Sequence, residues 1–149
     1  MKRSPMPRRR ATPRRKPAVT CRFQRCSKRP AIEGMCQSHA LRTADDLFSK
    51  MIRARDGRCV AREFFPDITC WGGLQAMHLV RRRYGPRFDP INAASGCVAH
   101  HHFLTVNPDE HFEFCERWLG TDAYAELRAR RHDSWPPLGE VIERLKEAA

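Results

Sequence analysis

Three residues with the chemistry to move a proton or hold a metal ion, His78, Asn92 and His101, lie in one arginine-rich stretch of the chain. A histidine with its ordinary pKa near ~6.5 is mostly neutral at cellular pH, so its ring can accept a proton or bind a metal ion. Asn92 stands in a turn-rich loop, where an amide side chain can brace the backbone. Just before His101 comes Cys97-x-x-His100, a spacing typical of zinc ligands. A single histidine would indicate little, but this ordered combination predicts a site.

The first of two cysteine and histidine groups has the spacing Cys21-x4-Cys26-x9-Cys36-x2-His39. Two short-spaced ligand pairs suit a tetrahedral zinc ion, and Gly34 permits the tight turn before the second pair. The stretch has few large apolar residues, so without metal it could hardly hold a shape. Free thiols on a loop are the alternative. We expect a structural zinc site that has no open coordination position and therefore no catalytic role.

A second group is spread more widely along the chain and consists of Cys59, Cys70, Cys97 and His100. Seven cysteines in a reducing compartment favour metal ligation over disulfides, and these four residues would complete a second zinc site. The spacing between the first two ligands is long, and buried core thiols are the alternative for both of them. Cys115 lies outside both groups and is expected in the core.

The charge of the chain is unevenly distributed. Of the formal net charge of +11, residues 1–19 contribute +8 and contain no acidic residue, which leaves +3 for the remainder. A segment so rich in proline and arginine buries too little apolar surface to fold, so we expect residues 1–19 to be disordered. Clustered cations release counterions from phosphates, which favours DNA as the partner, although an anionic membrane surface fits the same charge. No stretch is apolar enough to span a bilayer or to direct secretion, so we expect an intracellular protein of the host cytoplasm without a membrane partner.

The periodicity of apolar residues predicts a helix over residues 43–56, with Thr43-x-x-Asp46 as a capping box and Gly57 as its stop. Residues 74–77 are predicted as a short strand that leads into His78. Asn107, followed by proline and two acidic residues, predicts the start of a helix that ends at Gly120. Further helices are expected over residues 121–130 and 138–149, the last packing on the core or on a second copy of the chain.

The segment from Cys59 to about Leu127 resembles phage and prophage HNH proteins of the NinG/Rap-like recombination group and their relatives. The resemblance rests on the turn and strand before His78, on HLVRRRY, RFDPIN and GCVAHHHF, and on the later NPDEHFEFCERWLG and YAEL. Members usually carry Cys-x-x-Cys before the nuclease histidine and Cys-x-x-Cys-His or Cys-x-x-Cys-Asn at the end of the core. Here Arg62 stands where a close second cysteine would fall, and His100 stands where the last pair usually has a cysteine.

The resemblance implies a role for each residue of the site. His78 would be the general base that deprotonates the attacking water, Asn92 would orient the hairpin, and His101 would hold one divalent cation, Mg²⁺ or Mn²⁺, against the scissile phosphate. Many members have Asp or His before the base as a second metal ligand, whereas this chain has Met77, which is unsuited to a hard cation. His102 is the rival of His101 for the metal and is better interpreted as a residue that packs or that supports a metal ligand. Four arginines are expected to meet DNA phosphates: Arg81, Arg82, Arg83 and Arg87.

These observations predict an α+β protein with a small ββα-metal (HNH, His-Me finger) core, flanking helices and zinc-stabilised loops. The expected parts are a disordered basic tail (1–19), a zinc knuckle (20–40), a nuclease domain (41–131) and a C-terminal helix (132–149). The expected function is metal-dependent hydrolysis of DNA in a phage or prophage recombination or packaging context, with a second copy of the chain or other phage DNA-processing proteins as further partners. The alternative is a catalytically silent, zinc-stabilised DNA-binding or assembly protein, which Met77 and the position of the charge surplus favour.

Overall fold

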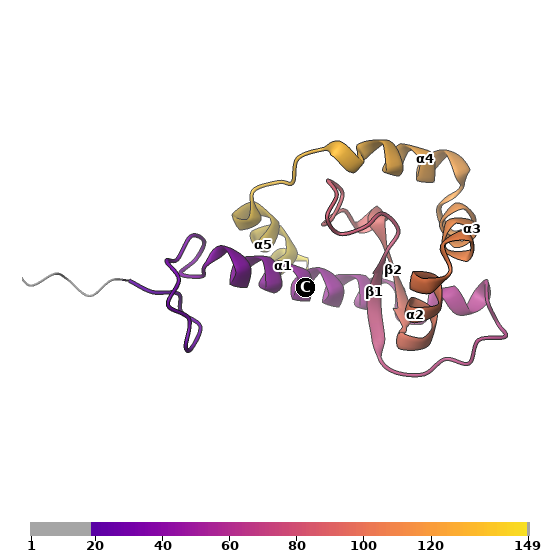
Figure 1. Ribbon diagram of the computed structural model, residues 1–149, viewed down its shortest axis with the longest axis horizontal. Helices are drawn as coiled ribbons and strands as arrows, with labels where there is room; N and C mark the ends of the chain where they lie inside the picture. Colours follow the sequence, from indigo (N-terminus) through magenta and orange to yellow (C-terminus); the bar gives the residue numbers. More distant parts are fainter. Residues whose placement is uncertain (1–18, 149) are drawn as a thin grey trace, which may run out of the picture.

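A two-stranded antiparallel hairpin lies near the centre of the computed structural model, which describes residues 19–148 (Figure 1). Strand β1 (Leu74–His78) pairs with β2 (Ala93–Cys97), and the register sets Leu74 opposite Cys97 and His78 opposite Ala93. A hairpin of such short strands is marginal by itself in water. Its stability therefore depends on the helices around it. Most of the basic tail expected at residues 1–19 lies outside the described residues.

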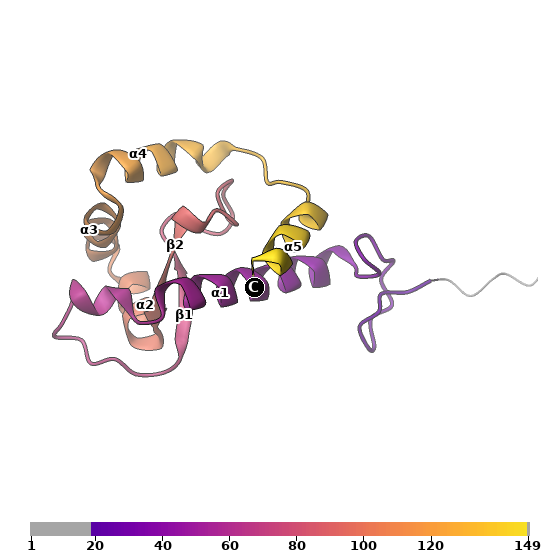
Figure 2. The same ribbon diagram turned by 180° about the vertical axis from the view of Figure 1, so that it is seen from behind.

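Helices cover the hairpin from two sides, so the mixed helix and strand content confirms the expected α+β class. The α-helices are α1 (Gln37–Asp56), α2 (Val98–Val106), α3 (Pro108–Leu119), α4 (Thr121–Ala129) and α5 (Leu138–Glu147), and short 3-10 helices are η1 (Val60–Glu63), η2 (Pro90–Asn92) and η3 (Arg130–His132). Helix α1 crosses the hairpin, α2 to α4 run around its other side, and α5 returns to α1 (Figures 1 and 2). Within residues 19–148, no helix combines the length and apolar character needed to cross a bilayer.

The two faces of the hairpin belong to two different hydrophobic clusters, because neighbouring residues of a strand point to opposite faces. Ala76 and Ala93 share one cluster with Phe48 of α1 and with buried residues of α5. Met77 and Ala94 belong to the second cluster. Buried residues of η1, α2, α3 and α4 complete this second cluster: Val60, Leu104, Phe114 and Leu127. The hairpin thus connects two cores.

Met77 takes a position that only a glycine neighbour permits. Its side chain is 3% exposed, and a Cβ added to Gly96 of β2 would overlap the Met77 sulfur. The thioether therefore lies over the backbone of Gly96 and fills the space between the sheet and the second cluster. Residue 77 is a core residue in this fold, which agrees with the expectation that it is no metal ligand.

Helix α1 begins six residues earlier than its apolar periodicity predicts. Cys36 precedes the first helical residue in an extended conformation, so the predicted capping box at Thr43 lies inside the helix. The Thr43 hydroxyl instead donates to the Met35 sulfur at 3.4 Å. The helix ends where expected, because Gly57 adopts a φ of 66° and its N–H donates to the Arg53 carbonyl. The buried stripe repeats every four residues: Ala40, Ala44, Phe48 and Ile52.

The C-terminal helices follow the predicted boundaries closely. Helix α3 starts at Pro108, and Gly120, with a φ of 87°, separates it from α4. Asn107 does not cap α3 as expected, because its side-chain amide donates backwards to the Phe103 carbonyl at 2.8 Å. Helix α5 buries Leu138, Val141, Ile142 and Leu145 in the cluster that contains α1, so the last helix is part of the folded core.

Candidate functional site

The first cluster, which we define as Cys21, Cys26, Cys36 and His39, lies at the start of α1. Its four ligand atoms are all within 4.8 Å of one another. The Cys26 and Cys36 sulfurs are 3.8 Å apart, which matches the separation of about 3.8 Å for two thiolates on a tetrahedral zinc with Zn–S near ~2.3 Å. His39 Nδ1 lies 3.2 Å from the Cys21 sulfur and 3.4 Å from the Cys36 sulfur. These residues could hold one metal ion.

Tight turns bring the distant members of the first cluster together. The Cys36 N–H donates to the Cys21 sulfur at 3.2 Å, and the Cys21 N–H donates to the Lys28 carbonyl at 2.9 Å. Gly34 has a φ of 75°, as its place before the second ligand pair predicts. The backbone N–H directed at sulfur favours a charged thiolate, which is the form that binds metal.

The second cluster, Cys59, Cys70, Cys97 and His100, gathers residues from four parts of the fold, and its ligand atoms also lie within 4.8 Å of one another. His100 Nδ1 lies 3.1 Å from the Cys97 sulfur and 3.6 Å from the Cys70 sulfur. The other ring nitrogen, Nε2, donates to the Phe65 carbonyl at 3.1 Å. Because that nitrogen carries the hydrogen, Nδ1 keeps its lone pair and faces the sulfurs. The ring is oriented for metal ligation.

The thiols of each cluster influence one another's ionisation. Burial raises the pKa of Cys97, but hydrogen bonds, led by the one from the backbone of His100, outweigh it and lower the pKa to about 6. Burial and the neighbouring sulfurs of Cys97 and Cys59 raise the pKa of Cys70 to about 11. Three thiolates so close together repel, and a cation between them removes that repulsion. The donor set therefore suits a divalent metal ion.

His78 ends β1 and is held in one orientation. Its Nε2 donates to the Arg87 carbonyl at 3.1 Å, and its ring lies 5.5 Å from the ring of Phe48 in α1. Because Nε2 carries the hydrogen, the neutral ring has its free lone pair on Nδ1. Burial, and then the charges of Arg82 and Arg87, lower the pKa of His78 to about 4. His78 is therefore neutral at physiological pH and able to accept a proton at Nδ1.

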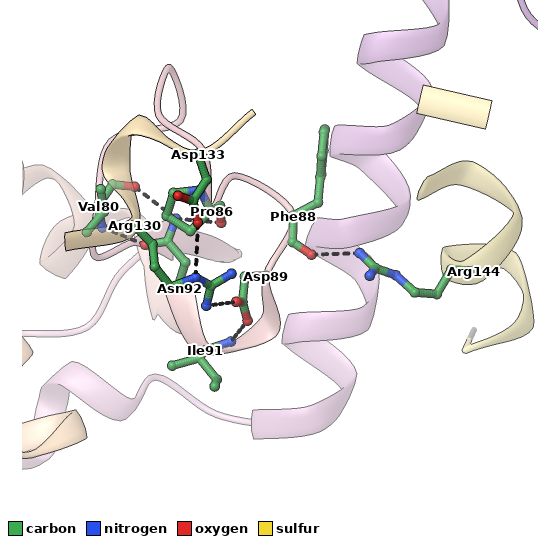
Figure 3. A network of polar contacts seen from close by, with 9 residues as sticks. All are labelled: Val80, Pro86, Phe88, Asp89, Ile91, Asn92, Arg130, Asp133 and Arg144. Carbon is green, nitrogen blue, oxygen red and sulfur yellow. Dashed lines mark hydrogen bonds and ion pairs between the residues drawn. The ribbon is translucent and has the colours of Figure 1, made fainter. Parts of the chain in front are cut away.

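Asn92 braces the loop that holds His78 in place (Figure 3). Its Oδ1 accepts the Val80 N–H at 2.6 Å, and its Nδ2 donates to the carbonyls of Val80 at 3.0 Å and Pro86 at 2.9 Å. The side chain is fully buried. These bonds link both sides of the loop between the strands. The Arg87 carbonyl of the same loop accepts the hydrogen bond from His78. Asn92 thus acts on His78 through the backbone of this loop.

His101 projects from the first turn of α2 beside β1. Its Nδ1 donates to the Gln75 side-chain oxygen at 2.7 Å, which leaves the lone pair on Nε2. Burial, followed by the charges of Arg82 and His111, lowers the pKa of His101. His102 is exposed, which argues against the packing role expected as one of its two alternatives. At this start of α2 the chain directs one histidine to the second cluster and the next to Gln75.

One cavity brings two of the three candidate catalytic residues, His78 and His101, together, and Asn92 does not line it. It has a volume of about 330 Å³ and is lined by His78, His101, Arg81, Arg82 and His111, among others. We call it the His78 cavity. A second cavity of about 290 Å³ also touches His78 and His101, and the acidic side chains of Asp45 and Asp46 line it as well. His78 and His101 therefore line two cavities, one with arginines and one with two carboxylates and Arg82.

The four arginines expected to meet phosphates differ in their surroundings. Arg81, Arg82 and Arg83 are exposed. Arg87 instead forms a two-pronged ion pair with Asp45 of α1, at 3.0 and 2.6 Å, and its guanidinium lies 5.0 Å from the Trp135 ring centroid. Its side chain is only 11% exposed. Arg87 thus ties the loop to α1 and is not free to bind a phosphate.

Several residues of the site have no signal in the local sequence. His111 of α3 lines the His78 cavity, and its Nε2 lies 3.4 Å from the His78 carbonyl oxygen. Gln75 orients His101. Arg128 and Arg131 come near Arg81 around an adjoining cavity. These contacts cross long distances in sequence, and only the alternation of β1 could have indicated that Gln75 shares a face with Met77.

No family model, no curated protein and no solved structure matches this chain.

Proposed function

We propose that the protein is a metal-dependent endonuclease that hydrolyses phosphodiester bonds in DNA, in a phage or prophage recombination or packaging context. The observation that supports this function best is the His78 cavity, in which a neutral histidine with a fixed ring orientation faces a second histidine and two arginines. A base, a cation site and phosphate-binding guanidinium groups are what phosphodiester hydrolysis requires.

His78 supplies the base in this mechanism. Nδ1 accepts a proton from a water molecule while the water oxygen forms a bond to phosphorus and the bond from phosphorus to the 3′-oxygen breaks. The departing 3′-oxygen takes a proton from solvent, and His78 later releases its own. A pKa of about 4 makes a weak base, but burial and the neighbouring positive charges cause that low value. A phosphate bound at Arg82 offsets one of these charges, so substrate binding raises the basicity of His78.

His101 is the residue that would hold a catalytic divalent cation. Its hydrogen bond to Gln75 leaves Nε2 as the donor atom, and waters and a phosphate oxygen would complete the coordination. When bound, the ion stabilises negative charge on the phosphate and on the leaving oxygen. Imidazole suits transition ions better than Mg²⁺, so Mn²⁺ and Ni²⁺ belong in any test beside Mg²⁺.

The two Cys₃His clusters are proposed to hold structural Zn²⁺. Tetrahedral sites of three thiolates and one imidazole are a common zinc arrangement, and all four positions are filled by the protein. Each zinc would stabilise the backbone around it and take no part in the reaction.

A second candidate function is a catalytically silent, zinc-stabilised protein that binds DNA or assembles with other proteins. Met77 favours this candidate, because a buried thioether occupies the strand position from which a second metal ligand would come. The hairpin then offers the catalytic ion few protein ligands.

A cleavage assay distinguishes the two functions. Purified protein carrying its zinc is incubated with plasmid, single-stranded and branched DNA in the presence of Mg²⁺, Mn²⁺ or Ni²⁺. The nuclease proposal expects cleavage by the parent and none by His78→Ala. Cleavage by neither protein, with any ion or substrate, would support the silent protein instead.

A further inference from the structure

A basic cavity adjoins the His78 cavity, and neither Asp45 nor Asp46 lines it. It has a volume of about 370 Å³, and four arginines line it: Arg81, Arg83, Arg128 and Arg131. Leu79, Arg81 and His111 line both cavities, so the two lie side by side. We call the second one the α4 cavity, because Arg128 comes from α4 and Arg131 from the 3-10 helix that follows it.

The arginines of the α4 cavity are free to bind an anion. All four are exposed, and within residues 19–148 no carboxylate forms an ion pair with any of them. Arg130, which lies between Arg128 and Arg131 in sequence, is different, since it pairs with Asp89 at 2.7 Å and with Asp133 at 3.5 Å. Figure 3 shows Arg130 in the network around Asn92. Arg130 thus stabilises the fold, whereas its neighbours Arg128 and Arg131 remain available on the surface.

Aromatic rings support two of these guanidinium groups. Arg83 lies 4.9 Å from the Tyr84 ring centroid and donates to the Tyr84 hydroxyl at 3.0 Å. Arg128 lies 5.7 Å from the ring centroids of both Phe112 and Tyr124. A guanidinium held against a ring keeps N–H groups available for a planar, two-pronged contact with phosphate oxygens. The side chains therefore need less ordering when a phosphate binds.

The other cavity that His78 lines has a different charge. Asp45, Asp46 and Arg82 line this cavity of about 290 Å³, and Arg87 pairs with Asp45. A polyanion that reaches His78 meets carboxylates at this cavity and, at the α4 cavity, four arginines that form no ion pair with a carboxylate of the described residues. This difference in charge favours the α4 cavity as the path of a strand that passes through the site.

We infer that the α4 cavity binds the phosphates that follow the scissile phosphate along a nucleic-acid strand, with Arg83, Arg128 and Arg131 as the phosphate ligands. The inference rests on the proposed function, because His78 defines which phosphate is cleaved. A run of regularly spaced phosphates fits four arginines around a cavity beside the His78 cavity better than a single small anion does. The contacts are to the backbone, so they add affinity without base specificity.

The test compares two variants that each lose two positive charges. Arg128→Gln/Arg131→Gln removes the far side of the α4 cavity. Arg42→Gln/Lys50→Gln is the control, because both residues are exposed on the face of α1 opposite its buried stripe. Binding of a fluorescent DNA duplex to zinc-loaded protein is measured by anisotropy over a range of salt concentrations, without added Mg²⁺, Mn²⁺ or Ni²⁺. Zinc content and thermal unfolding are measured for both variants to establish that they fold.

The Arg128→Gln/Arg131→Gln variant is expected to bind about tenfold more weakly, and the slope of log affinity against log salt should fall by about 1.8, from roughly 0.9 per lost phosphate contact. The control should change both quantities much less. Equal effects of the two variants, or no effect of either, would overturn the inference. So would a parent that binds anionic vesicles through these arginines and does not bind DNA.

Cleavage by the same proteins separates this inference from the proposed function. If the parent cleaves DNA and the Arg128→Gln/Arg131→Gln variant binds and cleaves as the parent does, the α4 cavity is not the path of the strand, although the nuclease stands. If the parent never cleaves but loses DNA affinity only in this variant, the binding site stands and the nuclease does not.

Discussion

Both metal-ligand clusters contain the same motif at the start of a helix. Cys36-x-x-His39 opens α1 and Cys97-x-x-His100 opens α2, and in both cases the cysteine immediately precedes the helix. A cysteine in this position lies beside the N–H groups of the first turn, whose partial positive charge favours thiolate. The histidine follows within that turn, so one local motif supplies half of each cluster.

The clusters differ in what the other two ligands connect. The first cluster takes all four ligands from residues 21–39, and its histidine ring stacks on Phe23 at a centroid distance of 4.2 Å near the surface. The second takes ligands from before η1, from the long loop ahead of β1, from β2 and from α2. Its His100 is completely buried and bonded to the Phe65 carbonyl. The same motif therefore closes a local loop in one place and joins distant segments in the other.

The largest effect is expected when the cysteine that precedes each of these two helices is replaced by serine. Cys97→Ser should prevent stable folding of the hairpin and of the helices packed on it, because the free energy of zinc binding, roughly 10 kcal/mol or more in small zinc domains, is coupled to folding. Cys36→Ser should unfold residues 21–36 and fray the beginning of α1 while the remainder still unfolds cooperatively. Hydrogen exchange and zinc content measure the difference.

Cys115→Ser provides the control for this pair, since Cys115 is buried outside both clusters. This variant should still bind two zinc ions per chain. Equal loss of structure in Cys36→Ser and Cys97→Ser would show that the two clusters have the same role.

The second effect contrasts His100 with His78. His100→Ala should lose one zinc and much of its stability. His78→Ala should keep both zinc ions and the fold but lose cleavage by roughly 10²–10⁴-fold, the usual contribution of a general base. Single-turnover cleavage rates and zinc analysis on the same preparations separate the two outcomes. A His78→Ala protein that cleaves as fast as the parent would exclude His78 as the base.

A third contrast concerns the neighbours His101 and His102. His101→Ala should abolish cleavage through loss of the catalytic ion, and an excess of Mn²⁺ should restore part of the rate, because mass action compensates for weaker binding. His102→Ala should retain most of the activity, since the ring is exposed. The rate as a function of Mn²⁺ concentration is the measurement. A rate for His101→Ala that is as high as the parent's at low Mn²⁺ would exclude the metal role.

The smallest effect is a dependence of stability on pH. Burial lowers the pKa of His78 in the folded protein to about 4, whereas the unfolded chain keeps the ordinary value of 6.5. As the pH falls from about 6.5 towards about 4, the unfolded state binds a proton that the folded state rejects, so stability decreases in this window and no further below it. Between pH 7 and pH 5.5 the parent should lose about 1 kcal/mol more than His78→Gln does. Urea unfolding in excess zinc measures this difference, and identical losses would show that His78 does not cause it.

The sequence predicts those parts of the site that depend on local spacing. Both metal clusters, the strand before His78, the end of α1 at Gly57 and the break at Gly120 follow from ligand spacing, alternation and glycine conformation. Only the arrangement in space shows that Arg87 meets Asp45, 42 residues away, or that His111 reaches the His78 carbonyl. Local patterns leave such pairings undetermined, because any of the arginines could have met the carboxylate.

The missed start of α1 has a similar cause. Apolar periodicity finds the stripe that faces the core, but the first turn of α1 holds His39 for the first cluster and carries little apolar surface. When Cys36 and His39 are interpreted only as metal ligands, they do not indicate that a helix begins there. Their spacing of three is also the spacing that places two side chains on the same face of a helical turn, and the repeated motif at Cys97 and His100 shows the same double meaning.

The contact between Met77 and Gly96 limits the evolutionary routes open to this hairpin. An aspartate at position 77 would supply a second protein ligand for the proposed catalytic cation, but it would bury a charge and leave the space above Gly96 empty. A larger residue at position 96 would fill that space only after Met77 had gone, because the two side chains overlap. Steric fit therefore couples the two positions, so the residue at one of them limits the size of the residue at the other.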